Sequence, residues 1–256
     1  MKKFFIFLIF ILVVISVCLL SVKEENIAII GAMDCEVSEI ASHLKNPASL
    51  NKNQINVTKG KLGKYNVILS KSGIGKVNAA MTTQFIIDKY NPKYIINTGL
   101  AGALADNLHS GDIIIAENVI QHDTKDALLQ YSKWKTSQEF DREKPYPYSS
   151  DRNLAEFYKN KLTENGNRVH LGTIATGDIF VEDRAKKDEL NQNFGAAAVD
   201  MESGAIMQVG DRNSTPVLVI RTICDSLTET EEEYSGKEEE FAKKSASSLI
   251  SVIENE

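Results

Sequence analysis

The sequence predicts an α/β fold with three layers, in which a mixed, largely parallel central sheet is covered by helices on both sides. Two observations predict this fold. Short apolar runs alternate along the chain with segments of helical periodicity, as strands and crossover helices do. Two further runs flank the turn Lys61–Leu62–Gly63–Lys64 in the pattern of a hairpin, which adds an antiparallel part. The 256 residues, 43% apolar and 25% charged, are ordinary for a globular protein and favour one domain.

The N-terminus is predicted to be a targeting segment. A basic start, Met1 to Lys3, precedes an apolar run over residues 4–20, which is the pattern of a secretory signal peptide. The run is also just long enough to span a bilayer, which leaves an uncleaved anchor and membrane association through residues 4–20 open. We therefore assign residues 1–22 to a signal peptide or N-terminal membrane anchor and residues 26–256 to the functional domain.

The predicted destination lies outside the cytoplasm. We expect an exported protein that is periplasmic or at the cell surface, with or without membrane attachment. Cys18 leaves lipidation open as a third outcome, although Val17 before it is bulkier than the residue that such processing usually requires. The rest of the chain keeps Cys35 and Cys224, which are too few for the disulfide framework of a small secreted protein. Its stability therefore has to come from an apolar core.

The first half of the domain is predicted to contain a strand, a hairpin and two helices. Asn46–Pro47 is expected to end the first helix and Asn91–Pro92 the second, because proline cannot continue a helix. The expected elements are a strand over Ile27–Ile30, a helix from Glu36, hairpin strands over Ile55–Lys59 and Tyr65–Ser70, and a helix over Lys76–Tyr90.

The second half is predicted to alternate strands and helices around a long loop. Glu117 to Ser150 shows little periodicity, so we expect a functional or interface loop there. The expected strands cover Tyr94–Asn97, Asp112–Ala116, His170–Thr176, Ala196–Val199 and Pro216–Ile223, and the expected helices cover Asp151–Asn165 and Asp183–Gln192, start at Ser203, and close the chain. An acid-rich tract, Glu229 to Glu240, precedes the terminal helix.

Polar residues follow five apolar runs at their carboxyl ends, which is where α/β sheets bind ligands. They are Glu36, the Gly99 to Gly102 loop, Asp178 with Phe180, Asp200 to Glu202, and Asp225. The coincidence favours an active site built from carboxylates. Such a site in a partly apolar pocket suits acid–base cleavage of a glycosidic bond.

Several other chemistries are excluded by the sequence. Gly73–Ile74–Gly75–Lys76 lacks the earlier glycine and the following Ser or Thr of a phosphate loop, and Asn78 replaces the third glycine of the dinucleotide fingerprint. The four histidines lack metal-ligand spacing, so no metal is predicted. No Gly-x-Ser-x-Gly nucleophile motif is present. The net charge of −6 argues against a general nucleic-acid binder.

Six short motifs resemble, in order, those of the 5′-methylthioadenosine/S-adenosylhomocysteine nucleosidases. They are Gly31–Ala32–Met33 with Glu36, Ser72 to Val77, Ile96 to Gly99 with Ala101–Gly102, Gly177–Asp178 with Phe180, Asp200–Met201–Glu202, and Arg221 with Asp225. The resemblance runs from about Asn26 to the C-terminus. It implies the purine nucleoside phosphorylase-like α/β fold, a homodimer, and hydrolysis of the bond between adenine and a 5′-modified ribose, in methionine salvage, without a metal or an organic cofactor.

The resemblance also assigns residues. It implies that Glu36 is the general base for the attacking water, that Asp225 is the acid serving adenine N7, and that Glu202 holds the ribose hydroxyls. A proton at N7 improves the leaving group, and carboxylates favour the positive charge that grows on the ribose. The other implied substrate-binding residues are Ala101, Gly102, Phe180, Val181, Met201 and Arg221. The expected substrates are methylthioadenosine and S-adenosylhomocysteine, with 5′-deoxyadenosine as a further candidate that the sequence does not rank.

The chain departs from the family pattern at several positions. Leu100 stands where the family usually has Ser, and Cys224 stands where it usually has Ser before the catalytic aspartate, so each loses a hydroxyl. Asp200 replaces the usual Glu and is compatible with a purely structural role. Tyr234 is the candidate for the aromatic residue that covers the 5′ substituent. We do not expect a disulfide between Cys35 and Cys224.

Two other functions stay open. Relatives on this fold use phosphate as the nucleophile, but neither Gly31–Glu36 nor Asn97–Gly102 contains an arginine to grip it, so hydrolysis is favoured over a purine nucleoside phosphorylase. The other is an exported polyanion-binding protein, with a glycosaminoglycan as ligand. The region from Lys45 to Lys76 carries seven lysines and no acid. A solvated hairpin face explains these lysines more simply.

Overall fold

The computed structural model describes residues 25–124, 146–228 and 236–256. The predicted signal or anchor, most of the predicted long loop, and Tyr234 lie outside these ranges. Within the three described ranges, no helix combines the length and the apolar character that crossing a bilayer requires. Cys35 and Cys224 are both free thiols.

The described residues form one ten-stranded sheet with helices packed around it. The strands are β1 (Asn26–Gly31), β2 (Lys45–Lys52), β3 (Ile55–Leu62), β4 (Tyr65–Lys71), β5 (Ile95–Ala103), β6 (Ile113–Gln121), β7 (Tyr148–Ser149), β8 (Val169–Thr176), β9 (Ala196–Asp200) and β10 (Val217–Asp225). The helices are α2 (Asp34–His43), α3 (Lys76–Tyr90), α4 (Arg152–Glu164), α5 (Arg184–Phe194), α6 (Ser203–Arg212) and α8 (Glu238–Glu254).

The sheet is mixed, and part of it closes on itself. β1 runs parallel to β4 and β5, and β10 runs parallel to β5. β5 also pairs with β9, and the pairs β10–β6, β6–β8 and β8–β9 complete a ring of five strands. β9 meets β5 antiparallel at only two positions, Gly102 with Val199 and Ala103 with Ala198, so the carboxyl ends of these strands still come together. The predicted α/β architecture with a mixed sheet is confirmed.

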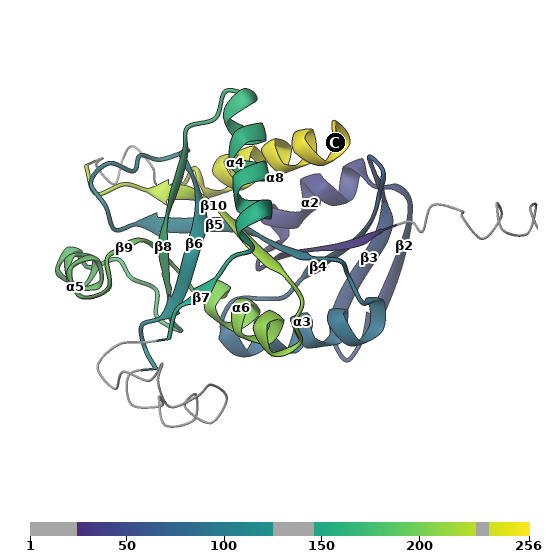
Figure 1. Cartoon of the computed structure of the whole chain (residues 1–256), viewed down its shortest axis with the longest axis horizontal. Coiled ribbons are helices and arrows are strands. Elements are labelled where there is room, and N and C mark those ends of the chain that lie inside the picture. Colours follow the sequence, from purple (N-terminus) through teal and green to yellow (C-terminus); the bar gives the residue numbers. More distant parts are fainter. Residues whose placement is uncertain (1–24, 125–145, 229–235) are drawn as a thin grey trace, which may run out of the picture.

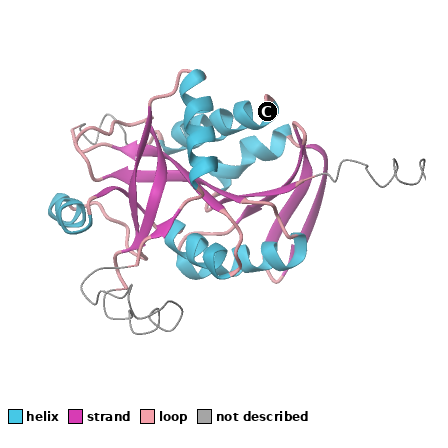
Figure 2. Ribbon diagram, viewed as in Figure 1, coloured by secondary structure: helices cyan, strands magenta, loops and turns pink. Residues whose placement is uncertain are grey.

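Helices cover both faces of the sheet (Figures 1 and 2). α2, α4 and α8 lie on one face, where Ile40, Tyr158 and Leu249 pack into a cluster with the strands. α3 and α6 lie on the other face, where Ile86 and Ile206 join a second cluster. α5 closes the end of the ring over β8 and β9 through a third, smaller cluster. Full burial of one such Leu or Ile side chain contributes roughly 1.5–3 kcal/mol, so these clusters hold the layers together.

Four strands named here differ from the sequence prediction. β2 occupies Lys45–Lys52, where the sequence predicted only the end of a helix. The strand was not predicted because it is almost wholly exposed and has no apolar pattern. β5 continues through the Gly99 to Gly102 segment, which was predicted to be a loop, and β10 continues to Asp225. β6 extends to Gln121 into the predicted long loop. The polar residues at these strand ends are therefore fixed by sheet pairing, not by loops.

Candidate active site

Glu36 lies at the start of α2, directly after β1, and backbone amides hold its carboxylate. Oε2 accepts hydrogen bonds from the N–H groups of Ala32 (2.6 Å) and Met33 (2.9 Å), and Oε1 accepts one from Leu100 of β5 (3.0 Å). Donors at the amino end of a helix favour a buried negative charge. Glu36 is only 3% exposed, so it is a carboxylate positioned in advance inside the fold.

Gly99 is the point where Glu36 and Arg221 approach each other. Its φ is 149°, and a Cβ there would clash with Glu36 Oε1 and lie 2.5 Å from Arg221 Nη1. Only glycine leaves room for both side chains at this place in β5. The glycine therefore brings a carboxylate from β1–α2 and a guanidinium from β10 together across one strand.

Arg221 is fully buried in β10 and binds groups from three other elements. Its Nη2 lies 2.7 Å from Asp200 Oδ2 and 3.4 Å from Glu202 Oε2, and it donates to Asn97 Oδ1 at 2.9 Å. Ser203 Oγ accepts hydrogen bonds from Nε at 3.3 Å and from Nη2 at 3.0 Å. Burial by itself would lower the pKa of Arg221, but the neighbouring carboxylates raise it above its usual value. We call Arg221, Asn97, Asp200, Glu202 and Ser203 the arginine network.

Asp200 has a structural position within the arginine network. Its Oδ1 accepts hydrogen bonds from Thr176 Oγ1 at 2.6 Å and from the Ser203 N–H at 3.3 Å. Its Oδ2 contacts the Ser203 hydroxyl and Arg221. Because both oxygens are engaged inside the protein, Asp200 orients Arg221 and the start of α6.

Glu202 lies at the N-terminal cap of α6 and is 5% exposed. Its Oε1 accepts a hydrogen bond from the Gly75 N–H at 3.0 Å, and its Oε2 faces Arg221. Burial raises the pKa of Glu202 to about 7, while Arg221 opposes the rise and Asp200 adds to it. Near neutral pH this carboxyl can therefore accept or donate hydrogen bonds, which suits the binding of hydroxyl groups.

Asp225 ends β10 and stands against Gly102 of β5. A Cβ at Gly102 would lie 2.8 Å from Asp225 Oδ1, so the glycine admits the carboxylate. The Asp225 side chain is 19% exposed, and its Oδ2 forms an ion pair with Lys187 Nζ of α5. We call Asp225 and Lys187 the lysine pair. Arg221 and Asp225 are four residues apart on one strand, which places their Cα atoms about 13 Å apart.

The remaining predicted site residues differ in how far they are buried. Ala101 is buried in β5 beside Gly102, and Val181 is buried in the cluster under α5. Met201 is partly exposed at the end of β9, between Asp200 and Glu202. Phe180 is 75% exposed, so within this chain it lines no enclosed pocket.

Cys224 occupies the position before Asp225 and partly replaces the missing hydroxyl. Its Sγ donates to the Ala101 carbonyl oxygen at 3.5 Å and lies 3.8 Å from Asp225 Oδ1. Burial and the Asp225 charge raise the pKa of Cys224 to about 12, which keeps it a neutral thiol. Leu100 also departs from the family pattern, but its backbone N–H still binds Glu36. Neither departure removes one of the carboxylates that the resemblance implies to be catalytic.

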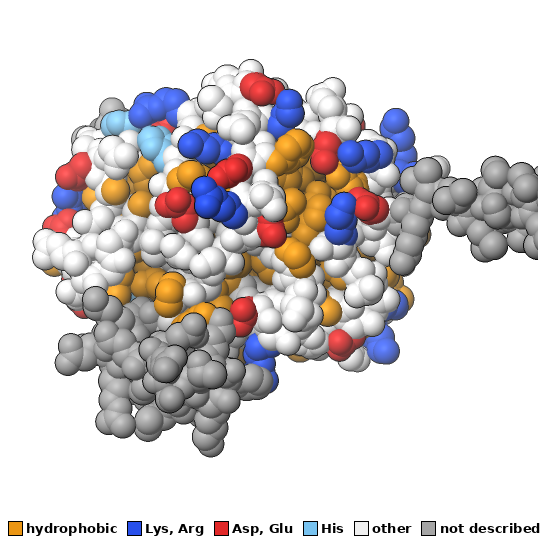
Figure 3. Space-filling view, in the orientation of Figure 1, with side chains coloured by type: hydrophobic (Ala, Val, Ile, Leu, Met, Phe, Trp, Pro, Cys, Tyr) orange, Lys and Arg blue, Asp and Glu red, His pale blue; other side chains and the backbone are white. Residues whose placement is uncertain are grey.

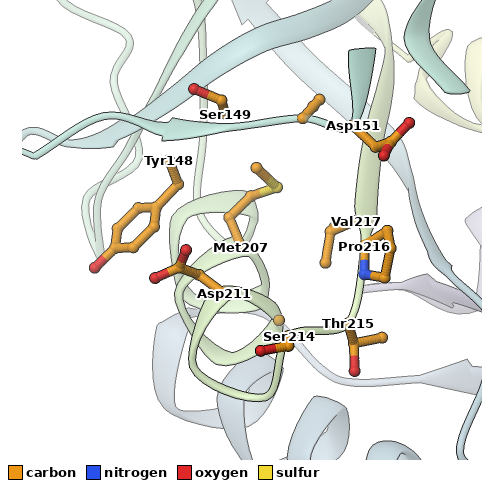
Figure 4. A pocket seen from close by; sticks show the side chains of 11 residues that line it. Tyr148, Ser149, Asp151, Met207, Asp211, Ser214, Thr215, Pro216 and Val217 are labelled. Carbon is orange, nitrogen blue, oxygen red and sulfur yellow. The ribbon is translucent and has the colours of Figure 1, made fainter. Parts of the chain in front are cut away.

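A pocket of about 340 Å³ lies elsewhere, at the amino end of β10 (Figure 4). Met207 and Asp211 of α6, Tyr148 of β7, and Pro216 line it, and it contains none of the predicted site residues. Parallel sheets bind ligands at the carboxyl ends of their strands, so we place the active site at the other end of β10. In the described part of the chain, no three His, Cys, Asp or Glu side chains gather closely enough to hold a metal ion.

Comparison with known proteins identifies the family. A family model described as the phosphorylase superfamily matches residues 26–255. The 5′-methylthioadenosine/S-adenosylhomocysteine nucleosidase of Staphylococcus haemolyticus is 34% identical over 230 residues, which cover 90% of this chain and 97% of that protein. The chain belongs to this nucleosidase family within the phosphorylase superfamily.

Solved structures of the nucleosidase family have the same fold. The S-adenosylhomocysteine nucleosidase of Streptococcus pyogenes, in complex with 5-methylthiotubericidin, is 30% identical with a TM-score of 0.80, and the match covers 92% of this chain and 98% of that one. The nucleosidase of Neisseria meningitidis, in complex with methylthio-immucillin-A, is 30% identical with a TM-score of 0.80, and the match covers 91% and 100%. The nucleoside phosphorylase-like fold expected from the resemblance is confirmed.

The sequence prediction missed several residues of this nucleosidase site. Asn97 and Ser203 belong to the arginine network and Thr176 binds Asp200, but none of the three was predicted as a site residue, although Asn97 stands within the Ile96 to Gly99 motif. Lys187, in contrast, could have been found from the helical pattern of the sequence. It lies three residues before Leu190, and both are on the buried face of α5, where helical spacing calls for an apolar side chain. A charge at an inward position usually has a buried partner.

Proposed function

We propose that the protein hydrolyses the N-glycosidic bond of 5′-methylthioadenosine and S-adenosylhomocysteine, in methionine salvage, and that 5′-deoxyadenosine is a further candidate substrate. The observation that carries the proposal is the gathering of carboxylates along the carboxyl-terminal half of β5. Glu36 and Arg221 lie beside Gly99 of β5, Glu202 contacts Arg221, and Asp225 lies beside Gly102 of the same strand. A nucleoside fits this arrangement, with its ribose beside the first group and its base at Asp225. The related nucleosidases from Streptococcus pyogenes and Neisseria meningitidis are in complex with 5-methylthiotubericidin and methylthio-immucillin-A, and these ligands support the substrate class.

The proposed mechanism divides the work between the two groups. Glu36 takes a proton from water as the oxygen attacks C1′ of the ribose, and the C1′–N9 bond breaks with its electron pair moving onto the purine. Asp225 delivers a proton to N7, so adenine leaves as a neutral base. Glu202 holds the ribose hydroxyls. The carboxylates near the ribose stabilise the positive charge that develops there as the bond breaks.

The decisive test measures adenine released from methylthioadenosine by the full-length protein in phosphate-free buffer. Glu36→Gln and Asp225→Asn keep the shape of each side chain but remove its proton chemistry, and we expect each to lower kcat by about 10²- to 10⁴-fold. Asp34→Asn is the matched control, because Asp34 is an exposed carboxylate on the same helix as Glu36. Normal turnover in either site variant would contradict the assigned roles.

Phosphorolysis is the competing reaction on this fold. Arg221 is the arginine at the centre of the described site, and it is buried and occupied by Asp200 and Glu202. A phosphate beside Glu36 and Glu202 would meet negative charge instead of a free guanidinium fork. These contacts favour water as the nucleophile. Adenine release that depends on added phosphate would reverse this choice.

A homodimer is part of the proposal. Large exposed apolar side chains of the described residues gather on α3, the turn before it and the loop before α5: Ile74, Val77, Met81, Ile179 and Phe180. Asp178 Oδ1 accepts a hydrogen bond from the Lys76 N–H at 2.8 Å, which ties this loop to the start of α3. Such a patch beside the site suits a second copy of the chain. Sedimentation of Val77→Glu/Phe180→Glu should show a monomer, and a persistent dimer would contradict this interface.

Export remains a proposal that rests on residues 1–22. Fractionation of cells that express the full chain, compared with a chain lacking these residues, tests it. We expect the full chain outside the cytoplasm or at the membrane and the shortened chain in the cytoplasm. Equal distributions would contradict the assignment.

Polyanion binding by the Lys45 to Lys76 region stays a prediction with less support. Ion pairs engage at least Lys64 with Glu256, Lys71 with Asp34, and Lys76 with Asp123. Acidic and basic side chains are also interspersed over the face in Figure 3, without a field of one sign. Heparin retention that disappears in Lys59→Glu/Lys61→Glu/Lys64→Glu would support the binding, and unchanged retention would remove it.

A further inference from the structure

The structure places a cation where the proposed mechanism needs a proton. Lys187 has 6% of its side chain exposed, and its ammonium group contacts Asp225 Oδ2. In this ion pair the ammonium group carries the positive charge and Asp225 the negative charge. An ionised Asp225 beside the purine carries no proton to donate. Its charge would also oppose the electron pair that moves onto the base when the glycosidic bond breaks.

We propose that Lys187 is a positioning residue that holds the proton for the leaving base and passes it through Asp225 to N7. This inference rests on the proposed role of Asp225. As the C1′–N9 bond breaks, one N–H bond of the Lys187 ammonium breaks and an O–H bond forms on Asp225. The carboxyl then gives that proton to N7, and its O–H bond is replaced by an N7–H bond. Lys187 is left as a neutral amine and regains a proton from solvent after adenine departs, while Glu36 returns the proton it took from water.

The position of Lys187 in the fold supports this role. Lys187 and Leu190 form the buried face of α5, and Leu190 packs with Val181 and Val199 in the cluster beneath it. A lysine on such a face loses hydration, and this loss is compensated only if the charge is paired. Lysine is also the basic residue that can release a proton in a protein interior, whereas arginine stays charged.

The groups around the pair leave Lys187 as the proton source. In the described ranges, the other titratable group in contact with Asp225 is the Cys224 thiol, at 3.8 Å from Oδ1. The pKa of Cys224 is raised to about 12, chiefly by burial and with a further contribution from Asp225, so this weak acid keeps its proton. Glu238 of α8 acts on Cys224 in the same direction, and β5 presents only Gly102 to the carboxylate.

Three variants of Lys187 separate proton supply from charge and from packing. Lys187→Met removes the charge and restores an apolar residue on the buried face of α5. Lys187→Gln is a second neutral variant of similar length, in case the first folds poorly. Lys187→Arg keeps the positive charge but cannot release a proton. Lys186→Met is the matched control, because Lys186 is the neighbouring lysine and pairs with Glu189 on the outer side of α5.

The readout is the pH profile of kcat/KM with methylthioadenosine, measured on full-length protein whose folding is checked by circular dichroism. At pH 7.5 we expect Lys187→Met and Lys187→Gln to lose about 10²-fold in kcat/KM or more. At pH 5.5 their loss should shrink below about tenfold, because an Asp225 without its cation takes a proton from solvent. Lys187→Arg should stay impaired at both pH values, and Lys186→Met should follow the wild-type profile.

Two results would overturn the inference. One is a wild-type pH profile in both neutral variants, and the other is full activity in Lys187→Arg, which would show that charge alone suffices. Asp225→Asn distinguishes this failure from failure of the proposed function. If Asp225→Asn is inactive while the neutral Lys187 variants are normal, Asp225 keeps its role and Lys187 loses its own. If Asp225→Asn is active, the assigned role of Asp225 is wrong, and so is the role of Lys187 that rests on it.

Discussion

The arginine network and the lysine pair each join carboxylates to a buried cation, but they are built in different ways. Arg221 contacts Asn97, Asp200, Glu202 and Ser203, which come from β5, β9 and the start of α6. Among the described residues, Lys187 has one ion-pair partner, Asp225, on a side chain that is 19% exposed. A group with many partners keeps its geometry when one contact changes. A single pair can open and exchange a proton when a substrate arrives.

The largest effect is expected from Arg221→Met. Removing the guanidinium leaves Asp200 and Glu202 buried without their cation, which typically costs about 3–5 kcal/mol in the free energy of unfolding. Urea denaturation at pH 7.5 measures this loss. The control is Arg152→Met, because Arg152 forms an exposed ion pair with Glu156 and should change the free energy by less than about 1 kcal/mol. Equal losses in both variants would show that the network does not stabilise the fold.

A smaller effect, with a defined pH dependence, is expected from Glu202→Gln. The pKa of Glu202 is raised from 4.5 to about 7, so the folded protein binds its proton more tightly than the unfolded chain does. Wild-type stability should therefore fall, relative to the variant, as the pH rises from 4.5 to about 7, and it should level off above that.

Denaturant unfolding of wild type and Glu202→Gln at pH 5.0, 6.0 and 7.5 measures this difference. Glu189→Gln, which alters an exposed carboxylate on α5, is the matched control and should track the wild type. A stability difference between wild type and Glu202→Gln that is constant with pH would mean that Arg221 compensates for the burial completely.

The smallest effect concerns the lysine pair and comes from Cys224→Ser. A serine hydroxyl donates a stronger hydrogen bond than a thiol, either to the Ala101 carbonyl or to Asp225. One improved hydrogen bond is worth about 0.5–1.5 kcal/mol, so we expect kcat/KM for methylthioadenosine to rise about two- to tenfold. Cys35→Ser, at the other free thiol, should leave kcat/KM unchanged. A loss of activity in Cys224→Ser would show that the chain has adapted around the sulfur.

The sequence predicted those parts of the site that strand ends define. Glu36, Glu202 and Asp225 follow apolar runs, and parallel pairing of β1, β5 and β10 brings such strand ends together. Arg221 lies within β10, and only the family resemblance named it. The pattern is visible because strand and carboxylate are adjacent in the chain. The resemblance to the nucleosidase family then gave each carboxylate a role, which the proposed variants test.

The parts that the sequence did not predict depend on contacts between distant segments. Lys187 of α5 contacts Asp225, which lies 38 positions later in the chain. No local sequence pattern predicts which residue a buried lysine will pair with. The closure of five strands into a ring depends on the short pairing of β5 with β9, which a strand list does not reveal. β2 escaped prediction because it is held by backbone pairing to β3 and buries almost no side chain.

The lysines near β2 are also explained by the open edge of the sheet. Ring closure leaves β5, β6, β8, β9 and β10 paired on both sides, whereas β2 pairs with β3 alone among the described strands. An unpaired strand edge is a template for aggregation, and proteins commonly guard it with lysine and proline. β2 carries Lys45, Pro47 and Lys52, and Asn46 has a φ of 52° that interrupts its regular backbone. The positive charge gathered there therefore keeps copies of the chain from joining edge to edge.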